Sequence, residues 1–135
     1  MNPSMPLSEA EKVGNELVSL CKQGKNLEAV AKLYADDIVS TEVMGSPEMP
    51  QTIRGKKAVT GKGEWWFANH TIHGGDVRGP FPNGDQFAVY FSYDITPKIG
   101  PMAGKRFTMH EVGLYTVRSG KVAEEKFFYS MNMGG

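Results

Sequence analysis

Apolar residues recur at helical spacing over the first part of the chain, in two groups separated by a turn. The first group follows a capping box formed by Ser8 and Glu11 and ends at Gly24, and the second begins near Asn26. The two apolar faces comprise Val13, Leu17, Leu20 and Cys21, and then Leu27, Val30, Ala31 and Tyr34. Each face needs a partner surface, so the pattern predicts two amphipathic helices packed on a further layer.

The pattern then changes to a strand, a loop and a third helix. Residues Ile38 to Met44 are rich in β-branched side chains, which favour a strand. Residues Gly45 to Pro50 hold two prolines and a glycine, so they predict a loop. Residues Gly55 to Asn69 predict a third helix, which its internal glycines weaken.

Alternation with a period of two dominates the rest of the chain and predicts four strands. The predicted strands are Thr71 to Arg78, Phe87 to Ile95, Arg106 to Val117 and Lys121 to Met131. The fold class is therefore α+β, with a curved antiparallel sheet wrapped around the N-terminal helices. Such a sheet encloses a cone with an internal pocket, and residues 1–135 form a single domain.

Charge and composition narrow the classes of function. Fifteen basic and fifteen acidic residues give a net charge of zero and form no basic stripe, so we expect no nucleic-acid partner. No apolar stretch approaches the roughly 20 residues of a membrane span, and the start of the chain does not resemble a signal peptide. With a single cysteine, Cys21, the chain forms no internal disulfide. These features predict a cytoplasmic protein without a membrane partner.

Three short motifs carry a family resemblance. They are the run Leu33 to Asp37, the run Ile53 to Val59, and Gly120 to Val122 followed by Glu124 to Phe128. In this order they resemble the SnoaL-like branch of the nuclear-transport-factor-2-like superfamily, over nearly the whole chain. The resemblance implies a cystatin-like cone fold related to ketosteroid isomerase. It implies no single activity, because this scaffold hosts isomerases, cyclases, hydratases, hydrolases and binding modules.

The resemblance also implies roles for particular residues. The family's general base commonly lies just beyond the Ala-Asp-Asp run, where this chain has Glu42. The isomerase's second, protonated carboxylic acid corresponds to Glu111, and its tyrosine donor corresponds to Leu17. Because leucine cannot donate a hydrogen bond, the resemblance does not extend to steroid isomerisation itself.

The residues alone leave alternatives open at these positions. Glu42 has apolar neighbours, so enclosure would raise its pKa and suit it to proton transfer; the alternative is an exposed strand glutamate. His110 and Glu111 are adjacent on one strand and point to opposite faces. Glu111 shares its face with Met109, Gly113 and Tyr115, which favours Glu111 as the pocket residue. The alternative for both is pairing with Arg or Lys across strands or at an interface.

Aromatic and sulfur-containing side chains predict the lining of an apolar pocket. The predicted ligand-binding residues are Trp66, Tyr93, Met109 and Tyr115. His70 and His73 lack the spacing of a metal site, and no nucleotide fingerprint is present, so the sequence predicts no metal and no cofactor.

Two hypotheses of function follow. The first is a cofactor-independent enzyme acting on a small apolar carbonyl compound, with Glu42, Glu111 and His110 as catalytic candidates. The second is a non-catalytic ligand-binding or assembly domain. We also expect a homodimer formed by the outer faces of the late strands, because Phe127, Phe128 and Tyr129 exceed what one sheet face can bury.

Overall fold

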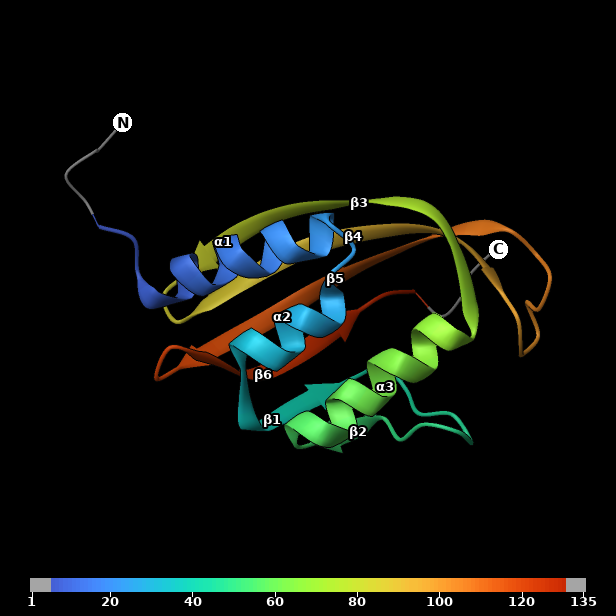
Figure 1. The fold of residues 1–135 in the computed structure, drawn as a ribbon, viewed down its shortest axis with the longest axis horizontal. Coiled ribbons are helices and arrows are strands. Elements are labelled where there is room, and N and C mark those ends of the chain that lie inside the picture. Colours follow the sequence, from blue (N-terminus) through green and yellow to red (C-terminus); the bar gives the residue numbers. More distant parts are fainter. Residues whose placement is uncertain (1–5, 131–135) are drawn as a thin grey trace.

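The computed structural model describes residues 6–130, which form three helices and six strands (Figure 1). The predicted end of the last strand, Met131, lies outside this range. The helices are α1 (Glu9–Lys22), α2 (Asn26–Leu33) and α3 (Lys56–Ala68). The strands are β1 (Tyr34–Thr41), β2 (Thr52–Arg54), β3 (His70–Asn83), β4 (Gln86–Pro97), β5 (Phe107–Arg118) and β6 (Lys121–Phe128). The capping box of Ser8 and Glu11 is present at the start of α1.

The six strands form one sheet in the order β2-β1-β6-β5-β4-β3, and the helices cover one of its faces (Figure 1). This confirms the predicted α+β class and the curved sheet wrapped on helices. The sheet is mixed rather than wholly antiparallel, because β1 and β6 pair in parallel. The chain between them, from β2 to β5, is long enough to return in the same direction, which local patterns do not reveal.

The long strands β3 and β4 bend around α1. Their pairing shifts register between Ile72 and Gly74 and again between Arg78 and Phe81. At Gly75 a Cβ atom would lie only 2.3 Å from the Ser92 carbonyl oxygen, so the close approach of the strands requires glycine. The shifts curl the sheet and leave its inner face concave.

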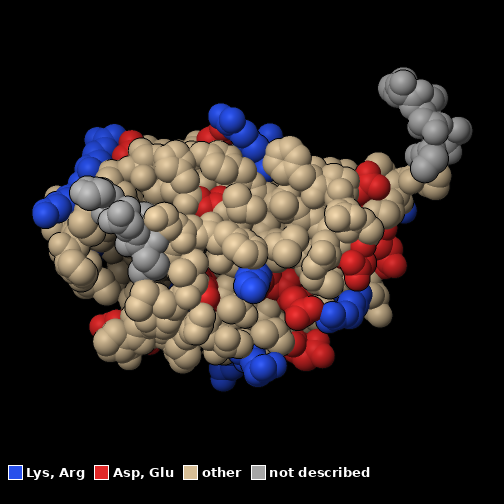
Figure 2. All heavy atoms as spheres, turned by 180° about the vertical axis from the view of Figure 1, so that it is seen from behind, with Lys and Arg blue, Asp and Glu red and all other residues tan. Residues whose placement is uncertain are grey.

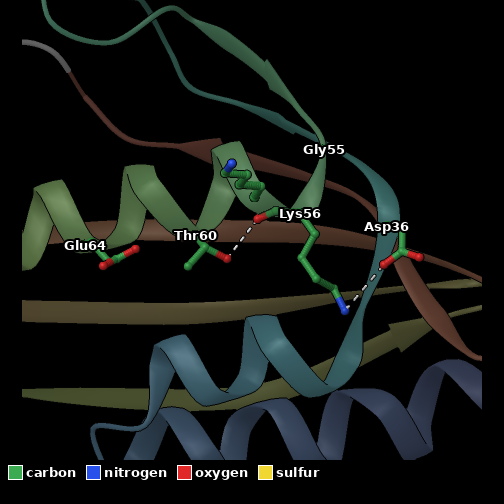
Figure 3. Close-up of a pocket in the computed structure, with 6 residues that line it drawn as sticks. Asp36, Gly55, Lys56, Thr60 and Glu64 are labelled. Carbon is green, nitrogen blue, oxygen red and sulfur yellow. Dashed lines mark hydrogen bonds and ion pairs between the residues drawn. The ribbon is translucent and has the colours of Figure 1, made fainter.

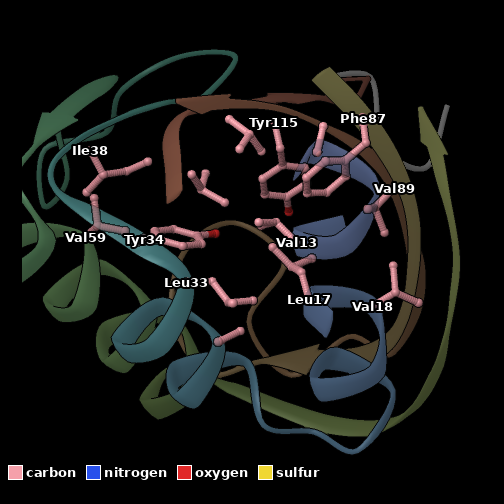
Figure 4. Close-up of a cluster of buried hydrophobic side chains, with 14 of the residues drawn as sticks. Val13, Leu17, Val18, Leu33, Tyr34, Ile38, Val59, Phe87, Val89 and Tyr115 are labelled. Carbon is pink, nitrogen blue, oxygen red and sulfur yellow. The ribbon is translucent and has the colours of Figure 1, made fainter. Parts of the chain in front are cut away.

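Buried apolar side chains fill the space between α1, α2 and the inner face of the sheet (Figure 4). Gly14 lets α1 approach closely, because a Cβ there would lie 2.8 Å from Pro80 and 3.1 Å from Phe87. The side chains with the least exposed surface include Leu17, Ile38, Phe87, Val89 and Val122. Ile38 and Ser40 are both completely buried, so this face of β1 is the interior one.

Candidate active site

Glu42 lies just beyond the end of β1 and is held by two donors. Its Oε2 atom is 2.6 Å from the Lys62 amine on α3, and its Oε1 atom accepts a hydrogen bond of 2.9 Å from the Tyr129 hydroxyl. Both contacts suit an ionised carboxylate. Burial raises the pKa of Tyr129, and Glu42 raises it further, so this phenol stays protonated and remains a donor. The structure therefore fixes the orientation of the Glu42 carboxylate from both sides.

The Lys62 amine connects Glu42 to a second, deeper carboxyl. It donates to Ser40 Oγ over 2.7 Å, and the Ser40 hydroxyl donates over 2.7 Å to Oε2 of Glu125. The Tyr34 hydroxyl donates to the other oxygen of Glu125. The parallel register of β1 and β6 pairs Ser40 with Glu125, which explains why these two side chains meet. Burial raises the pKa of Glu125, and Lys62 with the two hydroxyl donors opposes that rise.

Glu111 lies on the inner face of β5, where it pairs in register with Phe91 of β4. Among the described residues, none forms a hydrogen bond or ion pair with its carboxyl. Burial raises the pKa of Glu111 to about 8; Glu42 raises it further, and Lys62 opposes the rise. The Glu111 carboxyl is therefore mostly protonated at neutral pH and can act as a hydrogen-bond donor.

Several aromatic rings lie on the elements that carry this group. Trp66 on α3 stacks on His70, with ring centroids 4.3 Å apart, and its centroid lies 5.2 Å from that of Tyr93. The Lys62 amine lies 5.1 Å from the centroid of the Phe127 ring. Tyr115, which is 2% exposed, packs edge-on to Phe127 with centroids 6.3 Å apart. Aromatic rings therefore accompany the polar groups of this site, and the Phe127 ring lies beside Lys62.

The predicted site residues fall on both faces of the sheet. Trp66, Tyr93 and Met109 are half-buried, and Met109 pairs in register with Tyr93 on the inner side. His110 is exposed on the outer face, where its Nδ1 atom lies 2.7 Å from the Tyr90 hydroxyl. The structure therefore brings Glu42 and Glu111 into electrostatic contact and places His110 on the other side of the sheet from them.

Five residues of this site were not predicted from the sequence as functional: Lys62, Tyr129, Ser40, Glu125 and Tyr34. A signal for Lys62 was present, because it lies three residues after Val59 and four before Trp66 and so shares their apolar helical face. Without a pairing partner in view, nothing in the sequence connected this lysine to Glu42.

A separate open pocket lies beside the first half of α3 (Figure 3). It is lined by Asp36, Gly55, Lys56, Lys57, Thr60 and Glu64. The Lys56 amine is used within the protein: it donates to the Ala31 carbonyl oxygen over 3.0 Å and lies 3.9 Å from Asp36. Within residues 6–130, no group of three or more His, Cys, Asp or Glu side chains is arranged to hold a metal. In that same range no helix has the length and apolar character needed to cross a membrane.

The cone fold, together with carboxyls on its inner face, defines a class of small α+β proteins with an interior polar site. The sequence matches the profile of the SnoaL-like domain over residues 8–129, so the chain belongs to the SnoaL-like family. A comparison with curated proteins found no match.

Solved structures with a similar fold agree with this family assignment. A Mesorhizobium loti protein, provisionally described as a SnoaL-like polyketide cyclase and, in brackets, as a carbohydrate phosphatase, shares 48% identity with a TM-score of 0.81, over 87% of this chain and 97% of its own. A cystatin-like protein of unknown function from Xanthomonas campestris shares 15% identity with a TM-score of 0.68, over 88% of each chain. An LEH-like epoxide hydrolase from M. tuberculosis shares 16% identity with a TM-score of 0.63, over 90% of this chain and 83% of its own. The last two show a shared fold only.

Proposed function

We propose that this chain is a cofactor-independent enzyme that moves a proton on a small, largely apolar carbonyl compound, as an isomerase, cyclase or hydratase would. The observation that carries the proposal is the contrast between two neighbouring carboxyls. The Glu42 carboxyl is bound by Lys62 and Tyr129, whereas the Glu111 carboxyl has no hydrogen-bond partner among the described residues and has its pKa raised by burial to about 8. Two neighbouring carboxyls in such different environments are suited to act as base and acid.

In this proposal Glu42 removes a proton from the carbon next to the carbonyl group, and its carboxylate becomes a carboxylic acid. The electron pair of the broken C–H bond moves towards the carbonyl oxygen, which becomes an enolate oxygen. Glu111 hydrogen-bonds that oxygen and stabilises its charge. Return of the proton from Glu42 to a different carbon of the enolate system completes an isomerisation. In a cyclisation the enolate carbon attacks a second carbonyl carbon, and the oxygen of that carbonyl takes the proton from Glu42.

One of the similar proteins supports this class of chemistry. The polyketide cyclase description of the Mesorhizobium loti protein, at 48% identity, supports a small-molecule enzyme. His110 was a further candidate for the oxygen-binding role; its place on the outer face favours Glu111 for that role.

Proton exchange tests the proposal without knowledge of the natural substrate. A panel of small aryl methyl ketones is incubated in deuterated water, and loss of the methyl proton signal is followed by NMR. We expect exchange with the wild-type protein and a fall of about a hundredfold or more in Glu42→Gln. The matched control is Glu124→Gln, because Glu124 is exposed on the outer face of β6. Exchange that is equal in wild type and Glu42→Gln would remove Glu42 as the base.

A non-catalytic ligand-binding domain is the second candidate, favoured by Leu17, a 1% exposed core residue where the isomerase has its tyrosine. If the chain is such a binding domain, ketones should raise the melting temperature of the protein without any proton exchange. We further propose a homodimer formed through the outer face of the sheet. A cytoplasmic location and the absence of a nucleic-acid partner stay predictions from the sequence.

A further inference from the structure

Two polar groups on the inner face of β5 have no hydrogen-bond partner among the described residues: the Glu111 carboxyl and the Tyr115 hydroxyl. Every fully buried polar side-chain atom in residues 6–130 does have a partner. The oxygen atoms of Glu111 and Tyr115 must therefore border accessible space. Both side chains project from the concave face of β5, and Figure 4 shows the Tyr115 hydroxyl pointing into the interior of the fold.

Gly113 brings these two groups towards each other. Alternation along β5 puts residues 111, 113 and 115 on the same face. A Cβ atom on Gly113 would lie 2.8 Å from the Tyr115 hydroxyl oxygen and 2.7 Å from its ring carbon Cε2. The phenol ring of Tyr115 thus lies back over Gly113, in the direction of Glu111. The Tyr115 ring thus occupies the space that the missing side chain of Gly113 leaves.

Both groups are donors at neutral pH. Burial raises the pKa of Tyr115 well above its usual range, and the nearby Glu125 carboxyl adds to the effect. The Glu111 carboxyl is mostly protonated for the reasons given above. Two donors that point into an apolar interior, with no acceptor supplied by the described residues, are complementary to an oxygen acceptor on a ligand.

We propose that Tyr115 and Glu111 form a two-donor subsite for a single ligand oxygen, either a carbonyl oxygen or the enolate oxygen formed from it. Gly113 is required because any larger side chain would displace the Tyr115 phenol. This inference rests on the proposed function in one respect, namely that a carbonyl compound enters the cone. It deepens that function by naming the groups that recognise the oxygen, and it supplies a tyrosine donor from the sheet.

The surroundings suggest a suitable pair of probes. The position next to Glu111 across the β4–β5 ladder is Phe91, and the Phe91 and Tyr93 rings lie parallel with centroids 6.0 Å apart. A flat aromatic body suits this wall. We therefore choose the ketone 2-acetylnaphthalene and the hydrocarbon 2-isopropenylnaphthalene. The two have similar shapes, but the hydrocarbon has a CH₂ group in place of the carbonyl oxygen.

The experiment measures the affinities of both probes by fluorescence and the stretching frequency of a ¹³C-labelled carbonyl by infrared difference spectroscopy. We expect the wild-type protein to bind the ketone about tenfold more tightly than the hydrocarbon and to lower its carbonyl frequency. In Tyr115→Phe, the ratio of the two affinities should fall by about threefold to tenfold, and the carbonyl frequency should be lowered less than in the wild-type protein. Gly113→Ala should do the same although the hydroxyl is still present. Tyr90→Phe, which removes a hydroxyl from the outer face, is the matched control and should change neither quantity.

The carbonyl frequency reports hydrogen bonding to the ligand, so a purely structural role of Tyr115 would not change it. Tyr115→Phe decides the question even where Gly113→Ala does not fold. If Tyr115→Phe keeps both the ketone preference and the frequency shift, the subsite is wrong, and so it is if neither probe binds. Neither readout needs turnover. A frequency shift that depends on Tyr115, combined with unchanged proton exchange in Glu42→Gln, would support the subsite and remove the proposed base.

Discussion

The Lys62 amine lies 2.6 Å from Oε2 of Glu42, and the Lys62 and Glu42 side chains are only 15% and 21% exposed. The ion pair of Arg118 and Glu124 has almost the same length, 2.7 Å, but its side chains are 61% and 48% exposed. Charges that are withdrawn from water interact more strongly, and losing one partner leaves the other without compensation. The two pairs should therefore differ sharply in their contribution to stability.

Replacing Lys62 with methionine tests this difference. Methionine keeps a long apolar side chain beside Phe127 but removes the charge that faces Glu42 and the donor to Ser40. We expect the free energy of unfolding at pH 7 to fall by about 3 kcal/mol, the usual cost of breaking an enclosed ion pair. Urea denaturation followed by tryptophan fluorescence measures it.

The control for Lys62 is Arg118→Met, which breaks the exposed pair and should cost less than about 1 kcal/mol. The double variant Lys62→Met with Glu42→Gln should regain part of the lost stability, because it no longer encloses an unpaired carboxylate. Equal costs for Lys62→Met and Arg118→Met would contradict the view that the Glu42–Lys62 pair is held away from water.

A second prediction concerns Tyr34, whose hydroxyl donates to the buried carboxyl of Glu125. Tyr34→Phe keeps the ring and leaves one oxygen of Glu125 without a donor. We expect a loss of about 1 to 3 kcal/mol of unfolding free energy, since a buried acceptor loses its partner. Tyr90→Phe removes an exposed hydroxyl bonded to His110 and should change stability by less than about 0.5 kcal/mol. A similar, small effect for both variants would show that Glu125 does not depend on Tyr34.

Local patterns were sufficient to predict most of the fold. The capping box set the start of α1, and alternation located β4 and β5, because both signals depend on residues close together in the sequence. The three-residue strand β2 was missed because it is too short to show a period. The parallel pairing of β1 with β6 was missed because it joins residues more than eighty positions apart.

The candidate site was likewise predictable only where the signal lies in neighbouring residues. Alternation correctly put Glu111 on the face of β5 opposite His110. The partners of Glu42 could not be predicted, because Lys62 and Tyr129 reach it from α3 and from beyond β6 through tertiary packing alone. The ring of Tyr115 over Gly113 was equally hidden, since it depends on a side-chain conformation rather than on a pattern.

The outer face of the sheet carries the predicted dimer interface. Figure 2 shows that uncharged side chains make up most of this face, with acidic and basic groups interspersed. Val112 and Phe128 pair in register across β5 and β6 and are 37% and 47% exposed. We expect sedimentation equilibrium at micromolar concentration to give a dimer. Val112→Lys should give a monomer, because it places a charge in an apolar contact.

Phe81→Lys is the control for the dimer, because Phe81 is 58% exposed near the end of β3, away from β5 and β6. This variant should remain dimeric. A wild-type protein that is monomeric at all concentrations tested would rule out the interface, and a Val112→Lys protein that is still a dimer would move it elsewhere.

The last prediction concerns the pH dependence of stability and follows from Glu111. Burial raises the pKa of this carboxyl from 4.5 to about 8, so the folded protein holds a proton that the unfolded chain releases at lower pH. The stability due to this proton is fully present below about pH 4.5 and is lost as the pH rises through about 8. We expect the free energy of unfolding to fall by about 3 to 5 kcal/mol between pH 5 and pH 9, as measured by urea denaturation.

The Glu111→Gln variant separates the contribution of Glu111 to this pH dependence from that of the other buried carboxyl, Glu125. Glutamine is neutral at every pH, so the variant should lose most of the fall in stability between pH 5 and pH 9. The slope that remains should have the same sign, because burial also raises the pKa of Glu125. Glu124→Gln, on the exposed side of β6, should keep the wild-type slope. Identical slopes in wild type and Glu111→Gln would mean that Glu111 is already ionised in the folded protein, and it would then be unable to donate a hydrogen bond to a ligand oxygen.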